Sequence, residues 1–353
     1  MKDQIQSAQI VLPCADFNRS LKFFTERLGF RVEMIFPADA PSIAVVSGYG
    51  VALRLEESKE ILPLTLRLVG DFSAEMKREI SSPDGVRVIL IDAESPIEIP
   101  EAAPEFVVST LDDENSWSEG RAGMRYRDLI PGRLGGRFVA SHISIPVGGE
   151  VPDYVHFHRV RFQMIYCIAG WAKLVYENQG EPFLMNAGDC VLQPPEIRHR
   201  VLESSAKFEV LEIGCPAIHE TFADHKLNLP NEIVAPEKNY GNQRFLHHVA
   251  AKSVWEKSPI AGFETRDTGI AEATNGLADV RVFRAVANSR FSIKHSDEFL
   301  FFYILANNLR LSGGAEKTYR LGKNDAFILP ADSEYFIDAD SGLEMIRVNL
   351  PAE

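Results

Sequence analysis

Two strand-like patterns recur, in the same order, in the C-terminal part of this chain of 353 residues. Residues 162–174, FQMIYCIAGWAKL, align with residues 299–311, FLFFYILANNLRL, at an offset of 137. Residues 189–199, DCVLQPPEIRH, align with residues 325–335, DAFILPADSEY, at an offset of 136. Because the two offsets agree to within one residue, the simplest explanation is a pair of β barrels of one kind in tandem.

The remaining sequence predicts how the chain is divided. Residues 8–57 indicate a strand, a helix and three further strands, and residues 64–92 indicate two more strands. Residues 95–120 are first rich in proline and then polar and acidic, which is typical of a linker. Beyond them, short apolar strands alternate with turns. We therefore expect a mainly β chain with an N-terminal α+β module over 1–97, a linker over 98–120, a first barrel over 121–230 and a second barrel over 231–353.

The net charge and the cysteines restrict which binding partners and which cellular compartment the sequence predicts. A net charge of −13 argues against nucleic acid or an anionic membrane as a partner. No apolar run approaches the roughly 18 residues of a membrane span, and the N-terminus lacks the pattern of a secretory signal. The cysteines lie far apart without CxxC spacing, which predicts packed thiols in a reducing cytoplasm. They are Cys14, Cys167, Cys190 and Cys215.

Histidines accompany the first of the two repeats. Residues two apart on a strand project from the same face, so His156 and His158 point into the space which that face encloses. Gln163 opens the next strand, and His199 follows a Pro-Pro turn. Three imidazoles and one side-chain oxygen can hold a borderline divalent metal and leave one or two positions open. A His-x-His pair alone is common by chance, so the prediction depends on the other two residues.

The spacing of these residues resembles the two motifs of the cupin superfamily. The first motif reads G, five or six residues, H-x-H, three or four residues, E, six residues, G, and the chain has Gly149, His156, His158, Gln163 and Gly170 in that frame. The second motif reads G-D, a short apolar strand and P-P-G-x-x-H, and the chain has Gly188, Asp189, Pro194, Pro195 and His199, with Glu196 replacing the last glycine. The resemblance implies two tandem cupin barrels, a bicupin, with metal ligands His156, His158, Gln163 and His199.

One ligand departs from the motif of that family. Where the family has a carboxylate, this chain has the amide of Gln163, which leaves the site one negative charge short. The loss should lower the affinity for hard cations and raise the Lewis acidity of the metal. Alternatively, Gln163 only forms a hydrogen bond with water or substrate. His142 and Tyr166 lie on predicted barrel strands and join Gln163 as candidate catalytic residues, unless they pack inside a wall.

The second repeat lacks the same set of ligands. Ile293, His295, Leu300 and Tyr335 stand at its four ligand positions. Because one histidine does not hold a metal tightly, we expect this barrel to be structural, either as a cover or as part of a homodimer interface. Glu298, close to His295, leaves a recovered site as a minor alternative.

Residues 12–30 carry the strings L-P-x-x-D, S-L-x-F-F and L-G-F, which resemble the glyoxalase and vicinal-oxygen-chelate superfamily. The resemblance implies a βαβββ module, and SPDGVRVIL at 82–90 resembles the end of a second, truncated module. Metal sites of that family use a His or Gln and a Glu, positions that Gln9 and Glu56 match. Two oxygen ligands do not make a site, so we expect a module without chemistry, for dimerisation or small-molecule binding.

The leading hypothesis is a metal-dependent cupin enzyme with one divalent ion in the first barrel, Fe(II) being favoured over Mn, Zn and Ni. Such a site suits a dioxygenase or other oxidoreductase acting on a small organic or aromatic substrate. A non-redox isomerase or lyase is the close competitor, because cupin architecture hosts many chemistries. A second class is a bicupin that binds or senses a small ligand without catalysis. A third hypothesis places the activity in the N-terminal module. The lack of further metal ligands to accompany Gln9 argues against it.

Overall fold

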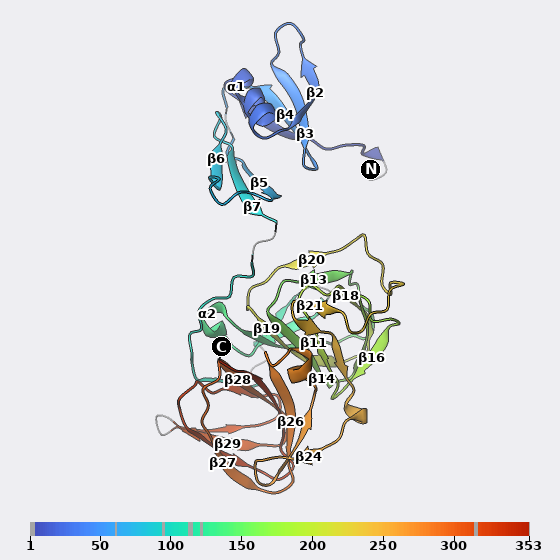
Figure 1. Ribbon diagram of the computed structural model, residues 1–353, viewed down its shortest axis with the longest axis vertical. Coiled ribbons are helices and arrows are strands. Elements are labelled where there is room, and N and C mark those ends of the chain that lie inside the picture. Colours follow the sequence, from blue (N-terminus) through green and yellow to red (C-terminus); the bar gives the residue numbers. More distant parts are fainter. Residues whose placement is uncertain are drawn as a thin grey trace. The chain divides into compact units, whose positions relative to one another are not determined.

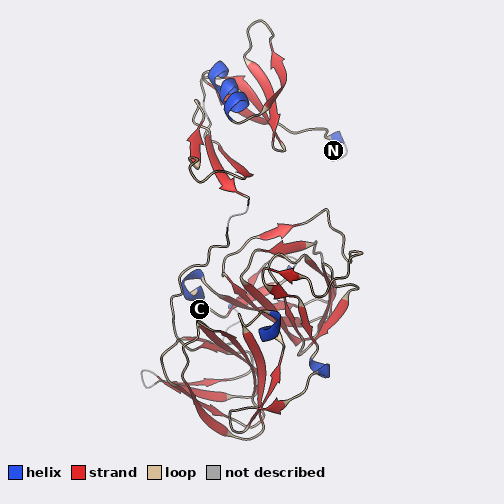
Figure 2. Cartoon of the chain, in the orientation of Figure 1, coloured by secondary structure: helices blue, strands red, loops and turns tan. Residues whose placement is uncertain are grey.

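The computed structural model describes residues 4–60, 62–93, 96–111, 116–120, 123–313 and 317–352. The chain divides into two compact units, Met1–Pro96 and Ile97–Glu353. Strands make up most of the regular structure, and the helices are short (Figure 2). No helix among the described residues is long and apolar enough to cross a membrane.

The first unit consists of two small sheets and one helical segment (Figure 1). Its elements are β1 (Ile10–Cys14), α1 (Phe17–Lys22), the π-helical turn η2 (Phe23–Arg27), β2 (Arg31–Phe36), β3 (Ile43–Gly48), β4 (Val51–Glu57), β5 (Thr65–Gly70), β6 (Glu79–Ser81) and β7 (Arg87–Asp92). The sheet orders are β1-β4-β3-β2 and β5-β7-β6. Asp16 caps α1 by accepting a hydrogen bond from the Arg19 backbone N–H. The predicted order of strand, helix and three strands is confirmed.

The first barrel of the second unit is built from two sheets. The larger has the order β23-β17-β14-β19-β11-β10-β9, and the smaller has the order β16-β15-β18-β13-β20, with β12 also paired to β18. The bounds are β9 (Trp117–Glu119), β10 (Arg125–Asp128), β11 (Val139–Ile145), β12 (Gly149–Glu150), β13 (His156–His158), β14 (Phe162–Ala169), β15 (Trp171–Tyr176), β16 (Phe183–Asn186), β17 (Cys190–Leu192), β18 (His199–Ser204), β19 (Phe208–Cys215), β20 (Thr221–Ala223) and β23 (Leu246–His248). A short helix, α2 (Arg133–Gly136), precedes β11.

The second barrel repeats this arrangement. Its sheets have the orders β24-β25-β26-β33-β28-β31-β8 and β27-β32-β29-β30. The bounds are β8 (Val107–Ser109), β24 (Glu256–Lys257), β25 (Phe263–Asp267), β26 (Asp279–Ala285), β27 (Ser289–Ile293), β28 (Phe299–Ala306), β29 (Leu309–Gly313), β30 (Thr318–Leu321), β31 (Ala326–Ile328), β32 (Tyr335–Ala339) and β33 (Glu344–Leu350). The hairpin β21 (Asn239–Tyr240) and β22 (Gln243–Arg244) and the 3-10 turn η5 (Ala250–Lys252) lie between the barrels in sequence, and α3 (Ile270–Ala273) precedes β26.

The sequence repeats occupy equivalent strands of the two barrels. β14 and β28 carry the first aligned pattern, and β17 and β31 carry the second. The same correspondence holds for β13–β18 and β27–β32: His156 pairs with His199 in one barrel, and Ile293 pairs with Tyr335 in the other. The tandem duplication predicted from two offsets is therefore present in the strand pairing.

The predicted linker over 98–120 needs correction. β8 lies within that range, yet it pairs with β31 at the edge of the larger sheet of the second barrel. In the opposite direction, β23 comes from the range assigned to the second barrel and pairs with β17 of the first. Each barrel therefore includes one strand from outside the residue range predicted for it. The composition around Val107–Ser109, rich in proline and acidic residues, is typical of a linker and did not indicate a strand. The three-residue strand forms because it pairs with β31, which lies far away in the sequence.

The larger sheets of the two barrels pack against each other through a shared apolar core. Phe162 and Met164 of β14 belong to this core, as do Phe299 and Phe301 of β28. The residues between them point the opposite way: Gln163 and Ile165 face the interior of the first barrel, and Leu300 and Phe302 face the interior of the second. Because both faces of these strands are buried, their sequences are nearly continuous apolar runs rather than alternating patterns. This explains why the aligned repeats consist mostly of apolar residues.

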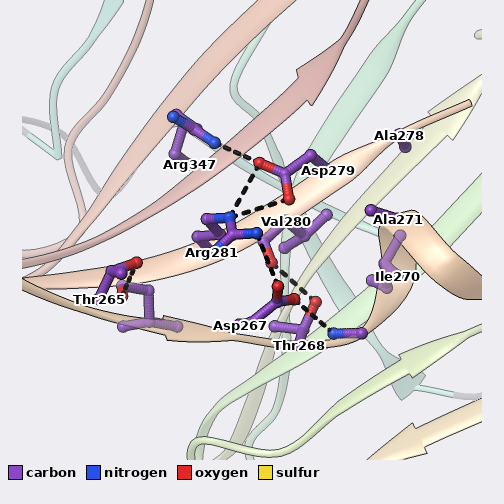
Figure 3. Close-up of polar contacts among 12 residues, drawn as sticks. Thr265, Asp267, Thr268, Ile270, Ala271, Ala278, Asp279, Val280, Arg281 and Arg347 are labelled. Carbon is purple, nitrogen blue, oxygen red and sulfur yellow. Dashed lines mark hydrogen bonds and ion pairs between the residues drawn. The ribbon is translucent and has the colours of Figure 1, made fainter. Parts of the chain in front are cut away.

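A polar network fixes the start of the second barrel (Figure 3). Arg281 of β26 donates to Asp279 at 3.0 Å and to Asp267 of β25 at 2.7 Å, and Arg347 of β33 also donates to Asp279. Thr268 donates its hydroxyl to the Val280 carbonyl at 2.8 Å. These bonds connect β25, β26 and β33, which are neighbours in one sheet, and α3 lies between β25 and β26 in the sequence.

Candidate metal centre

The centre begins with two histidines that face each other across a strand pair. His156 of β13 lies directly opposite His199 of β18, and their ring centroids are 4.3 Å apart. Tyr176 of β15 lies on the other side of His199 and stacks on its ring with centroids 5.4 Å apart. Burial, with the Glu212 carboxylate nearby, raises the pKa of Tyr176, so its phenol stays protonated. His199 is thus held between two neighbouring rings.

His158 completes a triad with His156 and His199. One ligand nitrogen from each of the three lies within 4.8 Å of the others. His156 and His199 are 1 % and 7 % exposed. Two neighbouring strands therefore bring together the three histidines that the motif spacing selected, and three imidazoles at this separation match the donor set of a borderline divalent ion.

Backbone carbonyls fix the orientation of two of the rings. Nδ1 of His156 lies 2.8 Å from the Tyr154 carbonyl, and Nδ1 of His199 lies 3.0 Å from the Ile197 carbonyl. A carbonyl only accepts, so each Nδ1 carries the proton and each Nε2 keeps a lone pair. Anchoring the distal N–H in this way is how metal-binding histidines are commonly oriented. The donor chemistry of the triad therefore fits a metal ion.

The strand β20 covers the third histidine. His158 is half-buried, its Nδ1 lies 3.2 Å from the Thr221 hydroxyl, and β20 pairs with β13 along its whole length. The ring of His219 lies edge-on to His158, with centroids 5.3 Å apart. The segment after β19 thus supplies part of the wall around the triad.

Gln163 does not face solvent but a carboxylate. It is 2 % exposed, and its Nε2 donates to Oε1 of Glu212 on the neighbouring strand β19 at 2.7 Å. Glu212 was missed in the sequence, although its place in FEVLEIGC puts it on the same face as the inward-pointing Val210. A carboxylate is therefore present in this cavity, one strand away from the position that the motif gives it.

Gln193 is a second residue that the motif did not identify. Its Nε2 donates to Nε2 of His199 at 2.8 Å, which is the nitrogen that would bind a metal. Its Oε1 is buried without a hydrogen-bond partner, and Gln193 is only 1 % exposed. An orphaned acceptor beside three imidazoles is an arrangement that a metal-bound water or substrate hydroxyl would satisfy.

A cavity of about 90 Å³ lies beside the triad, inside the barrel. Its polar lining consists of the three histidines, Gln163, Gln193, Glu212 and two tyrosines. The other side chains are apolar: Met124, Ile143, Ile145, Ile165, Leu174, Met185, Val201, Phe208 and Val210. Since a cavity of about 150 Å³ holds benzene, this one admits a compact reacting group.

Two of the candidate catalytic residues lie elsewhere. His142 is 1 % exposed, with Nε2 3.1 Å from Glu209 and Nδ1 3.2 Å from the hydroxyl of Tyr303 in the second barrel. Tyr166 belongs to the core shared by the two barrels, where burial raises its pKa. Both sit on the outward face of the larger sheet, so they are packed in the wall, which is one of the two alternatives that the sequence left open, and they do not line the cavity. The sequence did not show that this face is also buried.

The second barrel has no comparable cluster among the described residues. At the four equivalent positions, Ile293 and Tyr335 pair across two strands, Leu300 is buried in the barrel core, and His295 contacts the Leu329 carbonyl at 2.9 Å. Glu298, the residue considered for a recovered site, accepts hydrogen bonds from Arg137 and Arg161 instead. His295 and Glu298 therefore form hydrogen bonds with other parts of the chain rather than a metal site.

The two candidates of the N-terminal module are not brought together. Glu56 lies opposite Pro13 in the parallel pair β1–β4, and its carboxylate accepts from Arg54 at 2.5 Å. Gln9 is exposed and precedes β1, whose first residue Ile10 lies opposite Leu53. Glu56 belongs to no metal-binding cluster of His, Cys, Asp and Glu side chains among the described residues.

The first barrel thus carries a cluster of three histidines beside an internal cavity. Residues 141–214 match the family model for the cupin domain. The matched range includes all four predicted ligands and also Glu212. No curated protein matches the chain.

The solved structures that share this fold include bicupins. A structure concerning the Mn(II) centres of oxalate decarboxylase from Bacillus subtilis has a TM-score of 0.53 and 12% identity, covering 73% of this chain and 80% of that one. Salicylate 1,2-dioxygenase from Pseudaminobacter salicylatoxidans has a TM-score of 0.50 and 14% identity, covering 72% and 86%. A variant of that dioxygenase in complex with gentisate has a TM-score of 0.51 and 16% identity, covering 72% and 84%. At these identities the likeness is one of fold.

Proposed function

We propose that the first barrel is the active site of a metal-dependent cupin enzyme, most simply a dioxygenase acting on a small, largely apolar organic or aromatic substrate. The observation that carries the proposal is the triad of His156, His158 and His199 beside a largely apolar cavity, with two Nε2 lone pairs set by backbone carbonyls. The orphaned Oε1 of Gln193 beside this triad supports a bound ion with a water or hydroxyl ligand.

In this proposal, one group of cavity residues binds the metal ion and another group contacts the substrate. His156, His158 and His199 are the proposed ligands, and Gln163 is the proposed fourth. A divalent ion held there would act as a Lewis acid and, if it is Fe(II), would allow electron exchange with dioxygen. Apolar walls such as Ile165 and Phe208 exclude water and pack against the substrate. Gln193 accepts a hydrogen bond from a substrate hydroxyl.

The fold relatives favour two chemistries for such a site. One relative is a dioxygenase crystallised with the aromatic compound gentisate, which supports the oxygenase assignment and Fe(II). The other is a decarboxylase with Mn(II) centres, which supports a lyase or another non-redox reaction as the second candidate. Both relatives act on small molecules.

Oxygen uptake separates the two candidates. The full chain is reconstituted anaerobically with Fe(II) or Mn(II) and offered aromatic diols, hydroxybenzoates, 1,3-diketones and dicarboxylates. The proposal predicts oxygen consumption with Fe(II), abolished in His158→Ala. Carbon dioxide release without oxygen consumption would favour the lyase. A fully metal-loaded protein that binds these compounds and turns none of them over would contradict catalysis and favour a ligand-binding bicupin.

The remaining expectations stay proposals with specific support. The strand–helix–three-strand order of the first unit supports a glyoxalase-like module. Four free, buried cysteines support a reducing compartment such as the cytoplasm. A homodimer is expected from the sequence and is tested by light scattering of the purified chain.

A further inference from the structure

We propose that Glu212 is a positioning residue that orients Gln163 toward the metal and supplies the negative charge that Gln163 lacks. The inference rests on the proposed metal site, and it explains how an amide can stand at a position where the cupin motif has a carboxylate. Gln163 donates to Glu212 at 2.7 Å, and both residues line the cavity.

The strand register makes this contact possible. In the antiparallel pair β14–β19, Glu212 lies opposite Ile165, and Gln163 lies opposite Gly214. Because Gly214 has no side chain, nothing on the facing residue occupies the space beside Gln163. The long side chain of Glu212 reaches diagonally across the pair, a distance that such side chains commonly span. The amide and the carboxylate thus meet on the inner face of the larger sheet.

The hydrogen bond selects one orientation of the Gln163 amide. A carboxylate only accepts, so the NH₂ group must face Glu212, and the carbonyl oxygen is the end of the amide that points away from Glu212. That oxygen is the only atom of the side chain able to bind a cation. Without Glu212 the amide would be free to rotate and to present its NH₂ group, which a cation repels.

Glu212 also changes the charge at the site. Three neutral imidazoles and an amide bring no formal charge to a divalent ion, and the buried carboxylate of Asp153 lies behind a ligand ring, with Oδ1 3.5 Å from Nδ1 of His156. A carboxylate that accepts the Gln163 N–H polarises the amide and increases the negative charge on its carbonyl oxygen. The neighbouring wall is apolar, including Ile165 and Val210, so this effect is weakly screened. Outer partners of this kind typically change metal affinity 10- to 100-fold.

Manganese titration followed by electron paramagnetic resonance tests the proposal without any activity assay. Free Mn(II) is measured as it is added to the full chain and to the variants. Glu212→Ala removes the acceptor and the charge, so we expect its Mn(II) affinity to fall about 10- to 100-fold. Glu212→Gln keeps an acceptor but loses the charge, and we expect a smaller loss. The double variant Gln163→Glu/Glu212→Gln restores the motif carboxylate and should bind at least as tightly as the wild type.

Glu209→Gln is the matched control, because Glu209 lies on the same strand but contacts His142 outside the cavity. It should bind Mn(II) as the wild type does, and circular dichroism confirms that each variant is folded. Wild-type affinity and an unchanged spectrum in both Glu212→Ala and Glu212→Gln would overturn the role of Glu212. A wild-type chain that binds no Mn(II) would instead refute the metal site itself, so the two failures are distinguishable.

Discussion

Phe138 of the first barrel and Phe299 of the second stack with ring centroids 4.1 Å apart and an interplanar angle of 14°. Both side chains are fully buried. The contact lies in the apolar core that the larger sheets share. The two barrels therefore form one compact unit rather than two separate domains. The sheet that carries Gln163 and Glu212 therefore packs against the second barrel, even though that barrel has no histidine triad among its described residues.

Truncating this contact should destabilise the second unit. We expect Phe299→Ala to lower the free energy of unfolding by about 3–5 kcal/mol, because it removes a buried ring and leaves a cavity. Phe336→Ala is the control: Phe336 is 37 % exposed, and its loss should cost less than about 1 kcal/mol. Urea unfolding followed by circular dichroism measures both. Equal effects of the two variants would show that the shared core is not tightly packed.

The Glu209–His142 contact predicts a pH-dependent contribution to stability. The hydrogen bond from His142 lowers the pKa of Glu209 below its ordinary value of 4.5. A carboxylate with a lowered folded pKa stabilises the fold above its unfolded pKa, and the contribution is lost as the pH falls through the folded value. Glu209→Gln should therefore cost up to about 1 kcal/mol at pH 7, since Glu209 is partly exposed, and less in acid. Urea unfolding at pH 7 and below pH 4.5 measures the difference, and a cost that grows in acid would contradict it.

The four cysteines should be unreactive in the folded protein. All are free and buried, and burial raises the pKa of Cys14 and Cys215 to about 11 and that of Cys167 to about 12. The thiolate is the reactive form, so little of it exists at pH 8. Ellman's reagent should find no fast-reacting thiol in the native chain and four after unfolding in guanidinium. A thiol that reacts within seconds in the native state would refute this.

The sequence predicted the elements that depend on local pattern. Alternation placed His156 and His158 on one face, and the motif spacing brought His199 to them. The offsets near 137 predicted the equivalence of β14 and β28. These features follow from the period of a strand and from duplication, both of which can be read along the chain.

What the sequence did not predict depends on pairing between distant strands. Glu212 reaches Gln163 only through the register of β14 and β19, and His142 is buried only because a second barrel covers that face. β8 was hidden for the same reason, since its partner β31 lies more than 200 residues away in the chain. Alternation gives the two faces of a strand but not what covers each of them.

Metal content is the most direct test of the histidine triad. The full chain is purified, reconstituted with Mn(II) or Fe(II), passed through a desalting column and analysed by inductively coupled plasma mass spectrometry. His158→Ala removes one proposed ligand, and His295→Ala changes the equivalent position of the second barrel as a matched control. The account predicts one metal ion per chain in the wild type and in His295→Ala, and almost none in His158→Ala. A wild type without metal, or a His158→Ala variant that keeps a full equivalent, would contradict it.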